Sequence, residues 1–147
     1  MGSDIYTKAE RRNETGEWEC IPDLAPFKNR DYGTFGFLAN VRNYYEVSPI
    51  AERRGIPDDV SEEVAEYYED CNSFARSASW LTVSELDAFD YNAIIEDRRF
   101  IRKSDVTCDP GEGVMRTYRD FLGKMFFDDL KKLKEAGAER IVFWFDN

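Results

Sequence analysis

Side chains that bind anions recur between residues 42 and 80, in segments that flank expected helices and have no clear period of their own. Arginine carries a planar fork of donors that fits a phosphate or a carboxylate. In a chain whose net charge is −10, such donors could converge on a small anionic ligand, for example a nucleotide-like one. The predicted ligand-binding residues are Arg42, Asn43, Arg54, Arg76, Ser77, Ser79 and Trp80.

A purely structural role is the alternative for these arginines. Glu46, Glu52 and Asp58 lie close to them in the sequence and could neutralise them as ion-pair partners. No glycine-rich phosphate-binding loop accompanies the set. Both interpretations therefore stay open at this point.

A second candidate surface is acidic. Seven of the thirteen residues from 58 to 70 are Asp or Glu, and two tyrosines, Tyr67 and Tyr68, lie among them. Such a helix could imitate a phosphate backbone and occupy a basic site on a partner protein, or it could simply be a solvated face. The predicted partner-binding residues are Glu62, Glu63, Glu66 and Glu69.

Two carboxylates near the chain ends are a third candidate. Asp4 lies in the first expected strand, and Asp146 follows the last one. If these strands pair, the two side chains could share a divalent cation or act as an acid and a base. Acidic residues near chain ends are also commonly just solvated, and no cofactor is expected.

The chain has no histidine, which removes the usual serine and cysteine hydrolase triads and most zinc sites. The cysteines, Cys20, Cys71 and Cys108, are odd in number and widely spaced, so they predict neither a disulfide framework nor a CxxC motif. Any catalysis would depend on carboxylates, Tyr, Lys or Arg. We expect a protein that is not an enzyme.

Net charge and chain length further restrict the possible binding partners, location and domain organisation of the protein. The excess of 30 acidic over 20 basic residues disfavours direct binding to nucleic acid or to an anionic membrane surface. No apolar run approaches the roughly 20 residues of a membrane span, so a cytoplasmic location is expected. The 147 residues, rich in aromatic side chains, predict one domain over residues 1–147.

Several elements should position these candidates in the first half of the chain. Residues 4–11 and 17–21 predict a hairpin around the turn at 13–16. Asp31 should cap a short helix, and residues 42–57 should form an irregular loop. A helix is expected over residues 60–70, with Asp59 as its N-cap and Glu62 at the third helical position.

The second half has stronger local patterns. Thr82 and Glu85 form a capping box, which predicts a helix from Val83. Residues 98–102 and 112–116 predict a second hairpin, and a long amphipathic helix should run from residue 117 to Gly137. The last strand, 140–145, is apolar on both faces and should be central. The whole predicts an α+β fold with a mostly antiparallel sheet covered by helices.

Several segments together resemble a family of small uncharacterised proteins encoded by phages and prophages. The segments are Met1–Tyr6, Tyr32–Asn43, Arg54–Asp58, Ser77–Thr82 and the end Val142–Asn147. Relatives begin Met-Gly-Cys-Asp-Ile-His and carry a His before Ser-x-Ser-Trp. This chain has Ser3, Tyr6 and Arg76 at the corresponding places.

The resemblance implies an accessory role in the cytoplasm of an infected bacterium. Combined with the arginine set, it predicts a non-catalytic binder of a small anionic host ligand. The alternative is an acidic protein that binds and inhibits or redirects a host protein, and the third possibility is a metal-dependent enzyme that uses Asp4 and Asp146.

Overall fold

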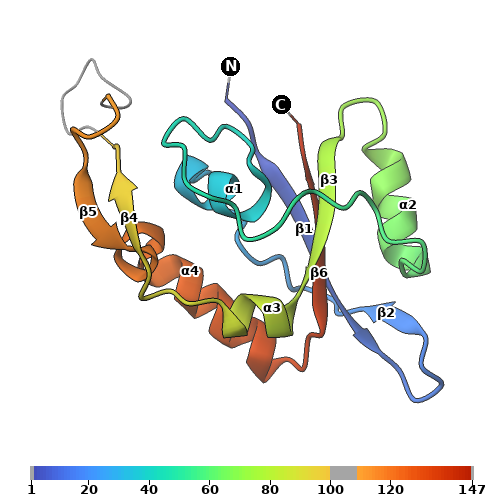
Figure 1. Ribbon diagram of the computed structural model, residues 1–147. Coiled ribbons are helices and arrows are strands. Elements are labelled where there is room, and N and C mark those ends of the chain that lie inside the picture. Colours follow the sequence, from blue (N-terminus) through green and yellow to red (C-terminus); the bar gives the residue numbers. More distant parts are fainter. Residues whose placement is uncertain (1, 100–108, 147) are drawn as a thin grey trace.

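The computed structural model describes residues 2–99 and 109–146, and its centre is a four-stranded antiparallel sheet (Figure 1). The first two strands form the predicted hairpin, and the last strand lies between the first and a strand from the middle of the chain. In spatial order the strands are β2 (Trp18–Cys20), β1 (Ile5–Arg12), β6 (Arg140–Phe145) and β3 (Arg76–Thr82).

Strand β6 is the central element, as its sequence predicts. All six of its residues are buried, because it has a strand on each side and a covered surface on each face. Ile141, Phe143 and Phe145 pack into the larger hydrophobic cluster, whereas Val142 and Trp144 pack into a separate one on the opposite face. This alternation divides the molecule into three layers.

Helices cover the two faces of the sheet unequally (Figure 1). The larger cluster lies between the sheet and three helices, α1 (Tyr32–Ala39), α3 (Val83–Ala88) and α4 (Tyr118–Glu135). Among the described residues, a single short helix, α2 (Glu62–Asp70), packs on the other face through Val64. Part of that second face is therefore left open beside the segment that precedes α2.

Helix α1 begins at the predicted cap, since the Asp31 carboxylate accepts from the amides of Gly33 and Thr34. Its two glycines are required for packing. A Cβ atom on Gly33 would lie 3.0 Å from the Phe121 ring, and one on Gly36 would lie 2.5 Å from the Asn43 side chain. Helix α1 can therefore be buried on nearly every side. A one-sided apolar stripe in the sequence would predict burial of one face only.

The predicted start of helix α2 is wrong by two residues. Ser61 is the N-cap and accepts from the amide of Val64, so Asp59 does not cap the helix. Instead, the Asp59 carboxylate accepts from Arg140 and from the Trp18 indole. A buried guanidinium is a stronger partner for a carboxylate than a helix amide that a serine can serve equally well.

Strand β3 was not predicted, because its sequence lacks strand alternation. A bulge interrupts the ladder between Arg76 and Ser79, and Ser77 within it has a positive φ of 58°. The segment before α2 covers the outer edge, where the Gly55 amide donates to the Ala78 carbonyl at 3.0 Å. The polar residues of β3 are therefore part of the sheet and not of a loop.

The capping box of α3 is confirmed, with Thr82 and Glu85 each accepting from the other's backbone amide. Helix α4 is also confirmed and contains a kink at Gly123, whose φ is 82°. Gly137, at φ 72°, follows its C-terminal end. Within the described residues, no helix combines the length and the apolar character needed to cross a membrane.

The second hairpin exists but is displaced from its prediction. Its strands are β4 (Ile94–Asp97) and β5 (Val114–Thr117), and they form a separate two-stranded sheet. Strand β4 ends at Asp97, and Arg99, which follows it, forms an ion pair with Asp97. The remainder of the predicted 98–102 strand, residues 100–102, lies outside the described residues, as does Cys108.

Strand β6 provides a direct test of this arrangement. Phe143 has no exposed surface, so Phe143→Ala should lower the free energy of unfolding by about 3–5 kcal/mol through lost apolar burial and the cavity left behind. Met125→Ala is the control, because that side chain is 61% exposed and its truncation should cost within about 0.5 kcal/mol. Urea unfolding followed by circular dichroism measures both; equal effects would contradict a central β6.

Candidate functional site

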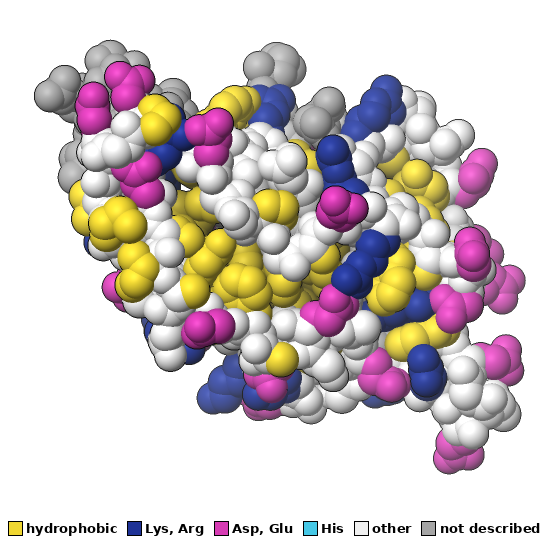
Figure 2. All heavy atoms as spheres, in the orientation of Figure 1, with side chains coloured by type: hydrophobic (Ala, Val, Ile, Leu, Met, Phe, Trp, Pro, Cys, Tyr) yellow, Lys and Arg dark blue, Asp and Glu magenta, His cyan; other side chains and the backbone are white. Residues whose placement is uncertain are grey.

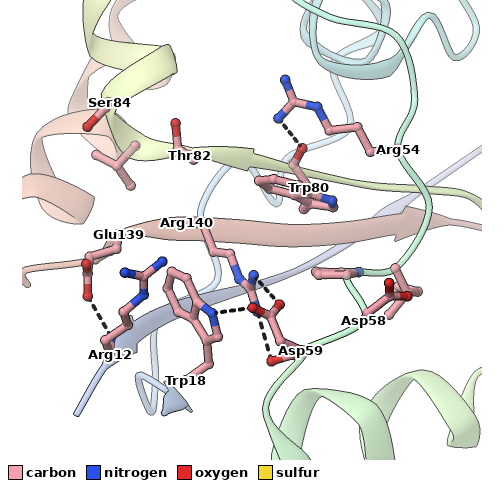
Figure 3. Close-up of a pocket in the computed structure, with 14 residues that line it drawn as sticks. Arg12, Trp18, Arg54, Asp58, Asp59, Trp80, Thr82, Ser84, Glu139 and Arg140 are labelled. Carbon is pink, nitrogen blue, oxygen red and sulfur yellow. Dashed lines mark hydrogen bonds and ion pairs between the residues drawn. The ribbon is translucent and has the colours of Figure 1, made fainter. Parts of the chain in front are cut away.

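The open part of the second sheet face is a groove with a volume of about 770 Å³ (Figure 3). It lies between the ends of β1 and β2, the start of β6, strand β3 and the segment that leads into α2. In Figure 2 basic and hydrophobic side chains lie side by side in this region, right of centre. The residues that line it include Arg12, Trp18, Arg54, Asp58, Trp80 and Arg140.

Strand register explains why these residues share one face. Arg140 pairs across the sheet with Glu10 on one side and with Thr82 on the other, and Arg12 pairs with Trp18. Directly opposed residues project to the same face, and so do residues two apart on one strand. Alternation therefore brings together Glu10, Arg12, Trp18, Trp80, Thr82 and Arg140.

Arg140 forms the floor of the groove. Its side chain is 4% exposed, and its Nε donates to Oε1 of the fully buried Glu10 at 2.6 Å. The other Glu10 oxygen, Oε2, accepts from the Ser61 amide at 2.7 Å. A buried ion pair holds its geometry when its remaining donors and acceptors are satisfied, and Asp59 completes this network at 2.8 Å from Nη1 of Arg140.

Two tryptophans flank the Arg140 guanidinium. Its Cζ lies 3.8 Å from the centre of the Trp18 ring and 5.9 Å from that of Trp80. The Trp18 indole is held in place because its Nε1 donates to Oδ2 of Asp59 at 3.0 Å. Hydrogen bonds from Arg140 and then from Trp18 keep the pKa of Asp59 below its ordinary value. The two rings are each half-buried and line the groove.

Arg54 lies at the rim, 4.7 Å from the Trp80 ring. Its two terminal nitrogens donate to the two oxygens of Glu85, at 2.7 and 2.5 Å, and Nη1 also donates to the Trp80 carbonyl. The hydrogen bond from Arg54, followed by the one from the Thr82 amide, lowers the pKa of Glu85 to about 2. The charge of Arg54 is thus compensated within the protein.

Arg12 differs from the other two arginines of the groove. Its guanidinium lies 4.7 Å from the Trp18 ring, and among residues 2–99 and 109–146 it forms no ion pair. Its backbone amide donates to Glu139 at 2.6 Å. The groove is therefore lined by two half-buried indoles and by one exposed cation whose charge no described carboxylate neutralises.

The structure brings together only part of the predicted arginine set. Arg54 and Trp80 line the groove, and Ser79 supports it by accepting from the Arg54 amide at 3.0 Å. Arg76 lies at the other end of β3, next to Phe145, and donates to the Ala75 carbonyl. Ser77 accepts from Arg53. These last residues therefore do not face the ligand space.

Arg42 and Asn43 belong to a separate loop. Arg42 donates to the Tyr44 hydroxyl at 3.0 Å and lies over the Tyr32 ring. The Asn43 amide group donates to Val47 and accepts from it, which closes the loop. Arg42, Arg54 and Arg76 consequently do not converge on one cavity, because β3 separates the last two and Arg42 lies beside α1.

Sequence reasoning missed Arg12, Trp18 and Arg140. A usable indication existed for Arg140, which opens an otherwise wholly apolar strand. A charged residue at that position needs a buried partner, and Glu10 is an acidic residue within the first predicted strand. The pairing of Arg12 with Trp18 came only from the structure, because the predicted turn at 13–16 would have placed Arg12 opposite Glu17.

The two terminal carboxylates, Asp4 before β1 and Asp146 after β6, flank neighbouring strands, and both form hydrogen bonds with other residues of the protein. Asp146 accepts from the Asp4 amide at 2.7 Å and from the Tyr6 hydroxyl at 3.0 Å. The Asp4 carboxylate is held by the fork of Arg30 at 2.9 and 3.0 Å. In the described part of the chain, no cluster of three or more Cys, Asp or Glu side chains has the arrangement of a metal site.

The acidic side chains of α2 point into solvent. Glu62, Glu63, Glu66 and Glu69 are all exposed, while Val64 holds the helix on the sheet. None of the four forms an ion pair with another described residue. These four exposed carboxylates lie on the same side of the sheet as the groove.

Comparisons with known proteins do not assign the site. No protein-family model, no curated protein and no solved structure matches the chain. Its function therefore has to be argued from the groove and its surroundings.

The Arg54–Glu85 pair generates a prediction about pH. The pKa of Glu85 is about 2 in the folded protein against an ordinary value of 4.5, so its stabilising effect is present above pH 4.5 and is lost as the pH falls toward 2. In Glu85→Gln the amide can still accept at the cap but cannot titrate. The free energy of unfolding should thus depend less steeply on pH between about 5 and 2.

The control for this measurement is Glu52→Gln, since Glu52 is exposed in the segment before α2. Urea unfolding at a series of pH values compares the two variants with the unmodified chain. An unchanged slope in Glu85→Gln would contradict a charge-assisted pair with Arg54.

Proposed function

We propose that the protein binds a small ligand that carries a planar ring and an anionic group, as nucleotides do, and binds it without chemical conversion. The observation that carries this proposal is the pair of indoles, Trp18 and Trp80, on either side of Arg140 in an open groove. A planar ring can pack against these half-buried indoles, on which Arg12 and Arg54 also stack, and Arg12 is a cation without a described ion-pair partner.

Stacking on tryptophan supports binding of a heterocyclic ring. A base stacked on an aromatic side chain contributes about 1–3 kcal/mol, and every base has such a face. Arg12 can add a charge-assisted hydrogen bond to a phosphate or carboxylate. Arg54 is less suited to this role, because an anion would first have to displace Glu85 from it.

Binding without catalysis agrees with the residues that line the groove. The chain contains no histidine, and the Thr82 hydroxyl is already engaged with Glu85 in the capping box. The resemblance to phage and prophage proteins adds a setting to the proposal, in which the ligand is a metabolite of an infected bacterial cell.

Tryptophan fluorescence tests the proposal. Trp144 has no exposed surface, so saturable quenching by a ligand would report on Trp18 and Trp80. We expect quenching by at least one of AMP, GMP, CMP and UMP. Arg12→Ala should raise the dissociation constant of that nucleotide about tenfold, as the loss of one charge-assisted hydrogen bond predicts.

Arg76→Ala is the matched control, because Arg76 is an exposed arginine at the far end of β3. Its affinity should equal that of the unmodified chain. An absence of saturable quenching by all four nucleotides at 10 mM, confirmed by calorimetry, would overturn the proposal. Equal losses in Arg12→Ala and Arg76→Ala would show that the groove is not the site.

A second candidate function is supported by a different observation, the exposed acidic face of α2. These four carboxylates have no described ion-pair partner. They can therefore contact a basic surface on a host protein without breaking an existing ion pair. Charge steering of this kind weakens as salt screens it. We propose that, in this case, the protein captures a basic partner through Glu62, Glu63, Glu66 and Glu69.

Charge reversal tests this second candidate. Replacing all four glutamates by Lys should abolish capture of the partner from host lysate at about 0.15 M salt, where the Debye length is near 8 Å. Reversal of four exposed acids elsewhere, Glu14, Glu52, Asp90 and Glu135, is the control and should preserve capture. Loss of capture in both variants, or in neither, would exclude α2 as the binding surface.

A further inference from the structure

Three carboxylates line the groove, which an anion alone would not require. Asp59 has both oxygens engaged, by Arg140 and by Trp18. Glu139 accepts from the Arg12 amide through one oxygen. Asp58 is exposed, and its carboxylate accepts no hydrogen bond from the rest of the described chain. Two adjacent acceptors are thus available at one position of the groove wall.

The position of Asp58 relative to Arg12 also favours a particular kind of ligand. In Figure 3 Asp58 lies at one end of the groove and Arg12 at the other, with Trp18 and Trp80 between them. Pro57 precedes Asp58 and is buried, which fixes the backbone at this point. A ligand that spans the groove would therefore meet a carboxylate at one end, the two indoles in the middle and a guanidinium at the other end.

We infer that the ligand is a guanine nucleotide, an inference that rests on the proposed function. A carboxylate presents two neighbouring acceptor oxygens. Guanine carries two neighbouring donors on one edge, N1–H and the 2-amino group, whereas adenine, cytosine and uracil each place an acceptor next to a donor. A guanine edge therefore matches Asp58 with two parallel hydrogen bonds.

The polarity of the nucleotide agrees with that of the groove. The sugar and phosphate leave the purine from the side opposite N1 and the 2-amino group. With this edge on Asp58, the ring lies along Trp18 and Trp80, and the phosphate extends toward Arg12. One ligand thus contacts the carboxylate of Asp58, the two indoles and the exposed guanidinium of Arg12 together.

Comparison of GMP with IMP tests the inference, because IMP lacks only the 2-amino group. Isothermal titration of the full chain should give a dissociation constant for GMP at least tenfold below those of IMP and AMP. Asp58→Asn replaces one acceptor by a donor and should bring GMP to within about twofold of IMP. Glu52→Gln, an exposed acid outside the groove, should keep the full GMP preference.

The outcomes separate this inference from the proposed function. Equal affinities for GMP, IMP and AMP that still fall in Arg12→Ala would overturn guanine selection and leave nucleotide binding intact. A GMP preference that survives Asp58→Asn would overturn the role of Asp58. No binding of any nucleotide would overturn both the inference and the proposed function. A GMP preference that Asp58→Asn alone removes would support both.

Discussion

The buried pair between Arg140 and Glu10 is the interaction on which the rest of this structure depends. It joins the first residue of β6 to the interior of β1, and Glu10 also accepts from the Ser61 amide at the start of α2. Breaking such a pair leaves an uncompensated charge in a dry environment, which is more costly than never having buried it. The pair therefore fixes how the two strands and α2 meet, and with them the floor of the groove.

From this pair follow both the shape and the charge of the groove. Because β6 lies between β1 and β3, Trp18 and Trp80 come to lie on either side of Arg140. Glu10 and Asp59 neutralise Arg140, and Glu85 neutralises Arg54. An incoming anion would consequently be attracted to Arg12, although the sequence predicts Arg54 and not Arg12 as a ligand-binding residue.

The fold could be predicted from the sequence wherever its determinants are local. The Thr82–Glu85 capping box and the apolar alternation of β6 involve residues within a few positions of each other, and both were predicted correctly. Strand β3 was not predicted because its polar residues form hydrogen bonds with residues distant in the sequence, as Ser79 does with the Arg54 amide. Of the predicted ligand set, Arg54 and Trp80 line the groove, while Arg42 and Arg76 do not.

The sequence by itself determined the class of fold, the central position of the last strand and the absence of histidine chemistry. Only the tertiary structure decided which polar residues share a site. Glu10 and Arg140 are 130 positions apart, and Trp18 and Asp59 are 41 apart. Such pairs depend on strand order and register, which local propensity does not specify, because each residue has several acceptable partners until the sheet is assembled.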